Sequence, residues 1–408
     1  MTTLAESTSV GKEYRRLFDE VATGALQREL DGQLPVDQVR QLKQVGFGAL
    51  RVPEEYGGRG LTWPELTQLW IDLAAADANL VQALRGHFAF AEDRLWQHRL
   101  GQDQGVWFRR FVEGEIAGNA WSEIGSTSID TQQTVLSDDG AGHLVLNGTK
   151  YYTTGTIYAE WADVYVRRTR PGLEDDFAIA IVDTRAPGVS VSDDWDGFGQ
   201  KGTGSGTTTF RDVQVDPANV LPFGERFPYQ TALYQHSLLA TLVGIGRRAL
   251  SDTIEEVQQR ERNYSHANAA RVRDDAQVLA RVGEIAARVY AAEAATLRVA
   301  AALQEAADTA GDPVAAHEAN LKAEIESSTA QVVVTQLILE ATTDLFDTLG
   351  ASGIASAKGL DRHWRNARTV SSHNPRILKA RVVGGHLVNG TPPPYAWAIG
   401  RTESSTAR

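Results

Sequence analysis

A polar segment near the C-terminal end of the sequence carries the side chains best suited to chemistry. The segment reads Asp361-Arg-His-Trp-Arg-Asn-Ala-Arg368-Thr-Val-Ser-Ser-His373-Asn-Pro375. A cationic helix end closed by a proline gives the same pattern, because basic side chains are favoured in a last helical turn. His373 could instead donate a hydrogen bond to a reacting group. Taken alone, the segment does not distinguish a helix end from a catalytic site.

The other familiar catalytic motifs are absent or out of context. Gly197-Phe-Gly199-Gln-Lys-Gly202 matches the dinucleotide fingerprint G-x-G-x-x-G, but the chain continues as a strand at 207–210 and not as a helix, so the fingerprint is not expected to bind a dinucleotide. The nine histidines form no H-E-x-x-H pair, and there is no G-x-S-x-G elbow or P-loop. The chain has no cysteine. We therefore expect no metal site, no thiolate nucleophile and no NAD(P)H fingerprint.

Three stretches of different periodicity must position these residues. Residues 1–117 are expected to be helical, because the capping box Thr62-x-x-Glu65 precedes apolar residues at helical spacing, namely Leu66, Leu69, Trp70 and Leu73. Residues 118–222 contain short alternating runs, which predict an antiparallel β domain, and Asn147-Gly148 is a strong hairpin-turn signal.

The last stretch, residues 223–408, is expected to form an antiparallel helical bundle. Its apolar residues repeat at helical spacing in three series: Leu279, Val282, Ala286 and Val289; Tyr290, Ala294, Leu297 and Ala301; and Val334, Ile338, Ala341 and Leu345. Helices, then strands, then helices make an α+β fold.

Composition excludes several classes of function. The 408 residues carry 40 basic and 52 acidic side chains, a formal charge of −12, which argues against a broad surface for nucleic acid or for an anionic membrane. No run of 18 apolar residues and no signal-peptide pattern occur. We expect a cytoplasmic protein that binds neither nucleic acid nor a membrane.

Five motifs follow one another along the chain: Val52-Pro-Glu-Glu-Tyr-Gly-Gly58-x-Gly60, Asn119-Ala-Trp-Ser-Glu123, Leu146-Asn-Gly-Thr-Lys-Tyr-Tyr-Thr-Thr154, Phe210-Arg-Asp-Val-x-Val215 and Arg365-Asn-Ala-Arg368. In this order they resemble the motifs of the acyl-CoA dehydrogenases. The resemblance covers roughly residues 45–380. It implies an N-terminal helical domain, a central β domain and a C-terminal four-helix bundle, with a flavin between the β domain and the bundle and commonly a homotetramer.

The departures from the dehydrogenase pattern indicate which branch of the family is closest. Dehydrogenases need a carboxylate base, but its two usual positions correspond here to Asn374 and approximately to Tyr234. The segment that meets the adenine of FAD is altered, at Asp347–Ile354. The chain resembles more closely the flavin-dependent monooxygenases of this fold, such as the dibenzothiophene monooxygenases, through 118–123, 193–206, and His363-Trp-Arg-Asn-Ala-Arg-Thr369 followed by His373.

This resemblance implies the oxygenase component of a two-component system. Reduced FMN, with FAD possible, would be supplied by a separate reductase through diffusion and would react with O2 to a C4a-hydroperoxyflavin, which oxygenates a small aromatic or sulfur- or nitrogen-containing substrate. The alternatives are a dehydrogenase-like or nitroalkane-oxidase-like flavoenzyme and a scaffold without activity.

The resemblance also assigns residues. The catalytic group would be His373, Asn119, Thr154 and His87, and the cofactor-binding group would be Asn119, Trp121, Ser122, Thr153, Thr154, Arg262, Ala351, Ser352 and His373. Two of these have simpler explanations, because His87 could be a helix histidine packed against aromatic rings, and Arg262 could form a surface ion pair with Glu261. The family has a tyrosine where this chain has Ala91, and a histidine where it has Val370.

Overall fold

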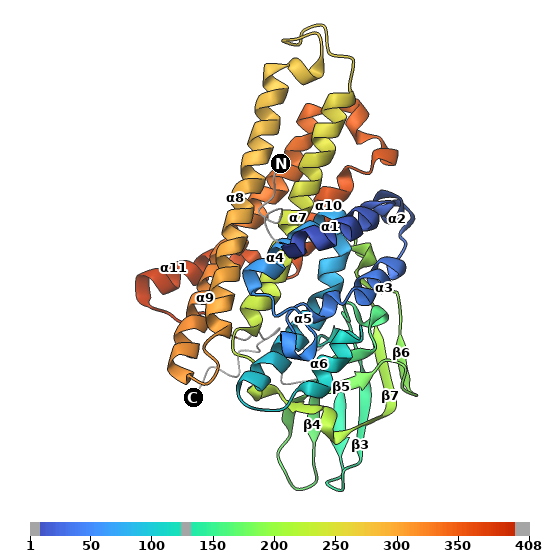
Figure 1. Cartoon of the computed structure of the whole chain (residues 1–408), viewed down its shortest axis with the longest axis vertical. Helices are drawn as coiled ribbons and strands as arrows, with labels where there is room; N and C mark the ends of the chain where they lie inside the picture. Colours follow the sequence, from blue (N-terminus) through green and yellow to red (C-terminus); the bar gives the residue numbers. More distant parts are fainter. Residues whose placement is uncertain (1–8, 124–131, 396–408) are drawn as a thin grey trace.

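The structure is a computed structural model that describes residues 9–123 and 132–395. Helices of the N-terminal part lie against one side of the bundle and above the sheet (Figure 1). They are α1 (Ser9–Ala22), α2 (Ala25–Asp31), α3 (Val36–Gln44), α4 (Trp63–Ala76), α5 (Ala78–Arg99) and α6 (Gly105–Val112). The predicted helical character of this stretch is confirmed.

Helix α4 begins at the predicted capping box. The Thr62 hydroxyl accepts a hydrogen bond from the backbone N–H of Glu65, and the Glu65 carboxylate accepts one from the N–H of Thr62 at 2.8 Å. The apolar residues that follow, Leu66, Leu69, Trp70 and Leu73, are all at most 2% exposed. Sequence spacing therefore identifies the buried face of this helix correctly.

The middle of the chain forms one mixed sheet. Its strands are β1 (Ala117–Ala120), β2 (Val135–Asp138), β3 (Leu144–Lys150), β4 (Trp161–Thr169), β5 (Asp176–Asp183), β6 (Val189–Val191), β7 (Thr208–Val215) and β8 (Val220–Pro222). The order is β6-β7-β3-β2-β4-β5-β8, with β1 beside β4. Most pairs are antiparallel as expected, but β1–β4 and β2–β4 are parallel.

The predicted turn at Asn147-Gly148 is wrong. These two residues lie inside β3, at a register shift opposite β7, and the β2–β3 turn is made by 139–143, where Gly140 and Gly142 have φ of 77° and 94°. A side chain on Gly148 would come within 2.5 Å of the Cα atom of Thr134. Close approach of backbone, and not a tight turn, requires this glycine.

The C-terminal helices form the expected bundle. They are α7 (Gln230–Gln259), α8 (Ala276–Ala307), α9 (Pro313–Asp344), α10 (Asp361–Ser372) and α11 (Lys379–Asn389). The series Val334, Ile338, Ala341 and Leu345 is fully buried. In contrast, Leu279 is 53% and Tyr290 is 71% exposed, and Ala294 and Ala301 are exposed as well. One apolar face of α8 therefore has no partner within the described part of the chain.

The segment with the dinucleotide-like glycines packs against the bundle. A short 3-10 turn at Lys201–Thr203 and then β7 follow it, and no α-helix opens there. A Cβ on Gly199 would meet the Arg365 carbonyl oxygen at 2.4 Å, and the Gln200 N–H donates to the Asn366 side chain. These glycines allow the β domain to pack closely against α10. As expected from the strand that follows them, they do not form the strand–turn–helix arrangement of a dinucleotide site.

The predicted domain boundaries can be placed on these elements. The boundary between residues 117 and 118 falls inside β1, and that between 222 and 223 follows β8 directly. Within the described ranges no helix is long and apolar enough to cross a membrane.

Candidate functional site

Five residues on or directly after α5, β1, α7 and α10 lie close together where the N-terminal helices, the sheet and the bundle join. We call this group the central cluster; it consists of Arg85, Asn119, Trp121, Tyr234 and His373. The Arg85 Nη1 donates to His373 Nε2 at 2.7 Å, and its guanidinium lies 5.4 Å from the ring centre of Tyr234. The rings of Tyr234 and Trp121 are 5.6 Å apart. Chain positions 288 residues apart, Arg85 and His373, thus become direct neighbours.

A glycine brings α5 onto β1 at this point. A methyl group on Gly86 would lie 2.9 Å from the Cβ of Asn119. The N–H of Asn119 donates to the carbonyl oxygen of Thr154 at 3.2 Å. Asn119 and Thr154, both predicted from the resemblance, are therefore adjacent, and Asn119 lies against α5 at the residue that follows Arg85.

Hydroxyl groups extend the cluster into the β domain. The hydroxyl of Thr154 lies 2.9 Å from that of Ser205, which lies 2.8 Å from that of Thr203. Thr153 donates to the Gly206 carbonyl oxygen at 2.8 Å. All four side chains are buried. They form a neutral, buried group of hydroxyls next to Asn119.

Two buried ion pairs hold the other edge of the cluster. Trp121 Nε1 donates to Asp163 at 2.8 Å, and Asp163 also accepts from Arg226 at 3.0 Å. The fully buried Lys150 donates to Glu123 at 2.7 Å and to the Trp121 carbonyl oxygen at 3.3 Å, and burial lowers the pKa of Lys150 to about 8. These pairs fix Trp121.

The predicted Ser122 is held by its backbone. Its carbonyl oxygen accepts a hydrogen bond from the N–H of Tyr151 at 2.9 Å, and its side chain is half-buried. Ser122 thus lies between Trp121 and Glu123, the two residues to which Lys150 donates hydrogen bonds.

His373 lies at the solvent-exposed edge of the cluster and is neutral. Desolvation by the surrounding protein, together with the charge of Arg85, lowers the pKa of His373 well below its usual range, and a side-chain hydrogen bond with Asn374 opposes the shift. Because Nε2 accepts from Arg85, the ring proton resides on Nδ1. His373 can therefore act as a neutral hydrogen-bond donor.

The rest of the C-terminal polar segment is structural. Arg362 and His363 both bond to Asp252 of α7, the histidine at 2.8 Å. Arg365 donates to Asp361 at 2.8 Å and to the Phe198 carbonyl oxygen at 2.9 Å. These contacts tie α10 to the bundle and the β domain, and so they set the position of His373 at its end.

Several buried polar atoms in or beside the cluster have no hydrogen-bond partner among the residues described. They are Arg85 Nε, Asn119 Oδ1, Tyr234 Oη and Arg226 Nη2. Burial without a partner is costly for such atoms, and it commonly marks a place where a ligand binds. They comprise two guanidinium donors, one hydroxyl and one amide acceptor, with no carboxylate, which suits the carbonyl, N–H and nitrogen edge of a flavin ring. The residues therefore fit the cofactor that the resemblance implies.

The cluster lacks the base that a dehydrogenase needs. Tyr234 and Asn374 occupy the two positions expected for it, and burial raises the pKa of the Tyr234 hydroxyl further above its ordinary value. Neither side chain can accept a proton at neutral pH.

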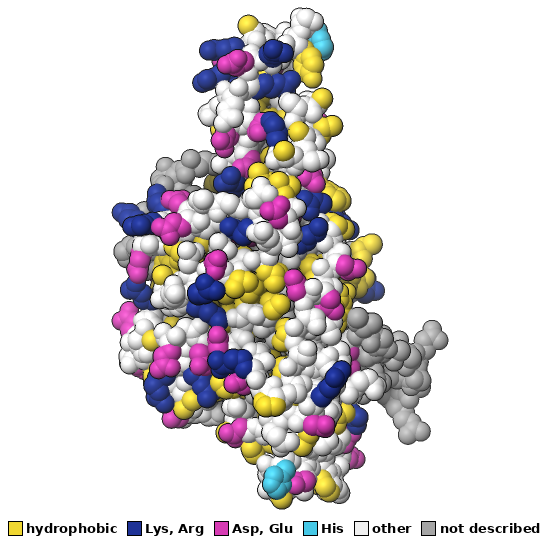
Figure 2. Space-filling model, turned by 90° about the vertical axis from the view of Figure 1, so that its right-hand side faces the viewer, with side chains coloured by type: hydrophobic (Ala, Val, Ile, Leu, Met, Phe, Trp, Pro, Cys, Tyr) yellow, Lys and Arg dark blue, Asp and Glu magenta, His cyan; other side chains and the backbone are white. Residues whose placement is uncertain are grey.

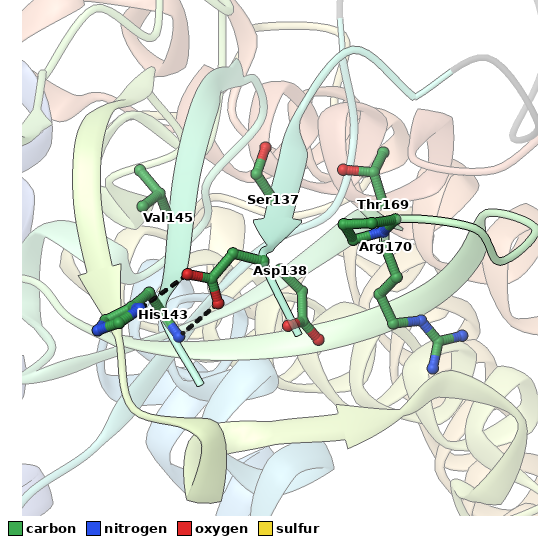
Figure 3. A pocket seen from close by; sticks show the side chains of 8 residues that line it. Ser137, Asp138, His143, Val145, Thr169 and Arg170 are labelled. Atoms are coloured by element: carbon green, nitrogen blue, oxygen red, sulfur yellow. Dashed lines mark hydrogen bonds and ion pairs between the residues drawn. The ribbon is translucent and has the colours of Figure 1, made fainter. Parts of the chain in front are cut away.

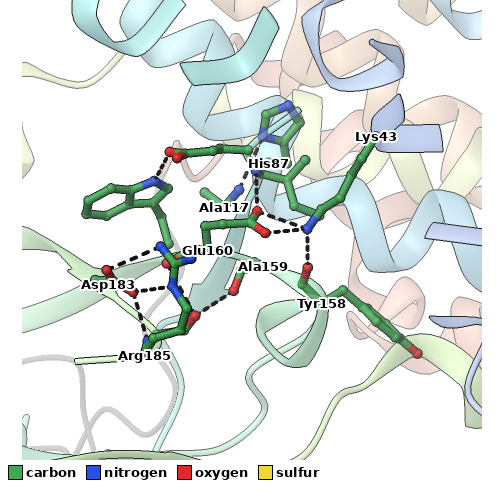
Figure 4. A network of polar contacts seen from close by, with 12 residues as sticks. Lys43, His87, Ala117, Tyr158, Ala159, Glu160, Asp183 and Arg185 are labelled. Atoms are coloured by element: carbon green, nitrogen blue, oxygen red, sulfur yellow. Dashed lines mark hydrogen bonds and ion pairs between the residues drawn. The ribbon is translucent and has the colours of Figure 1, made fainter. Parts of the chain in front are cut away.

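His87 makes its hydrogen bonds outside the central cluster, and Figure 4 shows it beside Ala117. It is fully buried; its Nε2 donates to the Gly48 carbonyl oxygen at 2.9 Å, and its Nδ1 accepts from the Ala117 N–H at 3.3 Å. Two positions along a helix differ by about 200°, so His87 and Arg85 leave α5 on opposite sides. Burial lowers the pKa of His87 to about 4. The structure does not bring His87 together with the other predicted catalytic residues.

Three predicted cofactor residues lie together at the far end of the bundle, which we call the bundle tip. Arg262 is exposed in the α7–α8 loop, and Ala351 and Ser352 are exposed in a 3-10 turn (Gly350–Ile354) beside it. A Cβ on Gly350 would meet the Tyr264 hydroxyl at 2.7 Å, which shows how close the two segments are. Figure 2 shows Lys and Arg side chains gathered at this end. Within the described ranges Arg262 forms no ion pair with Glu261.

A surface hollow lies elsewhere and does not belong to the site. It measures about 520 Å³, and Asp138, Asp139, His143 and Arg170 are among the residues that line it (Figure 3). It is at the opposite end of β3 from Lys150, about 20 Å away at the usual rise of a strand. Asp139 and His143 pair with each other, and the described residues contain no group of three potential metal ligands.

Sequence reasoning overlooked Arg85, Lys150, Asp163 and Arg226. A charged residue inside an otherwise apolar helix or strand was the available signal, as for Arg85 beside Gly-His-Phe-Ala-Phe90. Such a residue is expensive to bury unless it has a partner or a function. The sequence does not show which.

Comparisons with known proteins identify relatives of this chain over nearly its whole length. Models of the acyl-CoA dehydrogenase N-terminal, middle and C-terminal domains match residues 5–104, 119–213 and 237–375. The dibenzothiophene monooxygenase of Rhodococcus qingshengii is 29% identical over 391 residues, covering 93% of each chain. The protein named "Probable FMNH2-dependent monooxygenase SfnC" of Pseudomonas putida is 26% identical and covers 93% of this chain and 94% of its own.

A solved structure supports the same relationship. The FMN-bound structure of TdsC from Paenibacillus sp. A11-2 superposes with a TM-score of 0.84 at 27% identity, covering 93% of this chain and 97% of TdsC. Family models, relatives and fold agree over nearly the whole length, and the missing base agrees with an oxygenase. The chain belongs to the acyl-CoA dehydrogenase family, within its branch of flavin-dependent monooxygenases.

Proposed function

We propose that this chain is the oxygenase component of a two-component system, which takes reduced FMN from a separate reductase and transfers one oxygen atom of O2 to a small sulfur-containing or aromatic substrate. The observation that carries the proposal is the central cluster itself. It gathers buried polar atoms without a partner among the described residues, namely the Arg85 Nε–H, the Tyr234 hydroxyl and the Asn119 amide oxygen, and it has no carboxylate base at either expected position. The names of the relatives agree, because they specify dibenzothiophene as a substrate and FMNH2 as a cofactor.

The residues around the cluster would hold the flavin ring. Asn119, Thr154 and the neighbouring Trp121, Ser122 and Thr153 offer amide, hydroxyl, indole and backbone groups. When bound, reduced FMN supplies the activation of O2. His373 would donate Nδ1–H toward the reacting oxygen, and it remains neutral because its pKa is lowered. Trp121 and Tyr234 would keep water away from that place.

The flavin phosphate would be bound across a subunit interface. The bundle tip, with Arg262, Ala351 and Ser352, carries exposed groups suited to phosphate but has no ring-binding residues. The apolar face of α8 around Tyr290 provides a surface on which a second copy can pack. A homotetramer would then bring the tip of one chain to the central cluster of another.

Rapid mixing of the enzyme and reduced FMN with O2 tests this function. Delayed return of the oxidised-flavin absorbance, with product formed from an organic sulfide and little H2O2, is the expected result. Immediate reoxidation with H2O2 as the only product would contradict it. Reduction of a tightly bound FAD by an acyl-CoA would instead favour a dehydrogenase.

A further inference from the structure

Arg85 differs from the other buried arginines of the described chain. Arg51, Arg94 and Arg226 are, like Arg85, at most 6% exposed, and each of these three contacts a buried carboxylate: Glu92, Asp93 and Asp163 respectively. Arg85 contacts no carboxylate there. Its hydrogen-bond partner is His373, which is neutral.

This difference leaves a positive charge without a counter-charge in the central cluster. A guanidinium is ionised at every physiological pH, so Arg85 cannot escape the cost of burial by losing its proton. The ring of Tyr234 compensates part of the cost through its π-face, 5.4 Å away. Compensation by a second formal charge is missing, which is unusual for a charge buried to this extent.

The hydrogen-bond donors of Arg85 that have no acceptor among the described residues indicate which chemical group could bind to it. His373 engages Nη1, whereas Nε has no acceptor. A guanidinium edge that includes Nε matches two oxygens of a carboxylate, sulfinate or sulfonate in a pair of parallel hydrogen bonds. A ligand carrying such a group would reach Arg85 from the side of His373, the exposed member of the cluster.

We propose that Arg85 is the subsite for an oxyanion group of the substrate, so that this enzyme oxygenates small anionic compounds such as organic sulfinates, sulfonates or carboxylates. The inference rests on the proposed function and specifies its substrate class. Dibenzothiophene, the substrate in the names of several relatives, is uncharged and would leave Arg85 without a counter-charge. In the proposed arrangement the anion binds Arg85 while His373, held by the same guanidinium, stays next to the reacting oxygen.

A matched pair of unreactive probes tests the proposal. Benzenesulfonate and benzenesulfonamide have nearly the same shape and differ in charge. Their affinity for the full-length protein with oxidised FMN is measured by calorimetry. We expect benzenesulfonate to bind at least about 10-fold more tightly, the scale of a charge-assisted hydrogen bond, and we expect Arg85→Leu to abolish this preference. Arg85→Lys should retain part of it, because the charge stays but the paired hydrogen bonds are lost.

Arg211→Leu is the control, since it removes the same charge from an exposed position of β7 and should leave the preference unchanged. If Arg85→Leu does not fold, Arg85→Gln replaces it. Equal affinity of the two probes for the wild type, or a preference that survives Arg85→Leu, would overturn the proposal.

The anion could also belong to reduced flavin. Anaerobic titration with reduced FMN separates the two sources: a weaker flavin affinity in Arg85→Leu with an unchanged probe preference assigns the charge to the flavin and overturns the substrate subsite. Failure of the proposed function is distinguishable as well. It would appear as a wild type that reoxidises FMN without any product, while the probe preference can still be present.

Discussion

The central cluster and the bundle tip carry the two halves of the proposed flavin site, and they differ in how much one chain supplies. In the cluster, residues on or directly after β1, α5, α7 and α10 come together within one chain; Arg85 bonds to His373, and the buried Asp163–Arg226 pair supports Trp121. At the tip, Arg262, Ala351 and Ser352 are exposed, and the described residues give Arg262 no ion partner. Under the proposed function, one chain would supply the residues around the flavin ring, whereas binding of the flavin phosphate would depend on assembly.

The largest effect is expected from breaking the core that supports the cluster. Asp163→Ala would leave Arg226 buried without its carboxylate and Trp121 Nε1 without an acceptor. We expect the free energy of unfolding to fall by about 3–5 kcal/mol in urea titrations. Asp175→Ala is the control, because it breaks a surface pair with Arg167 and should cost at most about 1 kcal/mol. Equal losses in both variants would show that the cluster is not held by this pair.

The pH dependence of stability tests whether His87 has a structural role and not a catalytic one. An unfolded histidine takes up a proton below about pH 6.5, but the buried His87 resists until about pH 4. Stability is therefore full above pH 6.5 and falls as the pH drops through this window, by roughly 3.5 kcal/mol for this residue. His87→Gln should remove that part of the acid sensitivity in urea titrations at pH 7 and pH 4.5. A variant with wild-type acid sensitivity and poor coupling of O2 use to product would instead return His87 to the catalytic group.

The exposed edge of the cluster is tested by His373→Ala. Loss of one preorganised donor should raise the barrier to oxygen transfer by about 2–4 kcal/mol, so that product falls and H2O2 rises in proportion. His143→Ala, in the distant surface hollow, is the matched control. Unchanged coupling in His373→Ala would remove this residue from the mechanism.

The sequence predicted the order of helices and strands and most residues near the cluster, because periodicity and family motifs are local. It failed where contacts are distant in the chain. From the sequence, Gly148 was expected in a turn, but the fold places it against Thr134. His87 was expected in the site, but Gly48 and Ala117 occupy both of its ring nitrogens. Arg85 and His373 are neighbours only after folding. The roles of these residues depend on their burial and on the atoms they contact in the fold, and residue type alone does not reveal either.

The smallest effect is expected from a substitution at the bundle tip. It directly tests whether the tip and the central cluster of different chains share one flavin. If Arg262 binds the phosphate of a flavin whose ring lies in another chain, Arg262→Ala should weaken FMN binding by about 1.5–3 kcal/mol and leave the oxygen chemistry of bound flavin unchanged. Fluorescence titration with FMN at several protein concentrations, combined with gel filtration, provides the measurement. Affinity should rise as chains assemble, because only the assembly joins tip and cluster. Arg271→Ala, an exposed arginine of the same loop that already pairs with Asp274, is the control. A monomer that binds FMN as tightly as the assembly would show that a single chain holds both halves of the site.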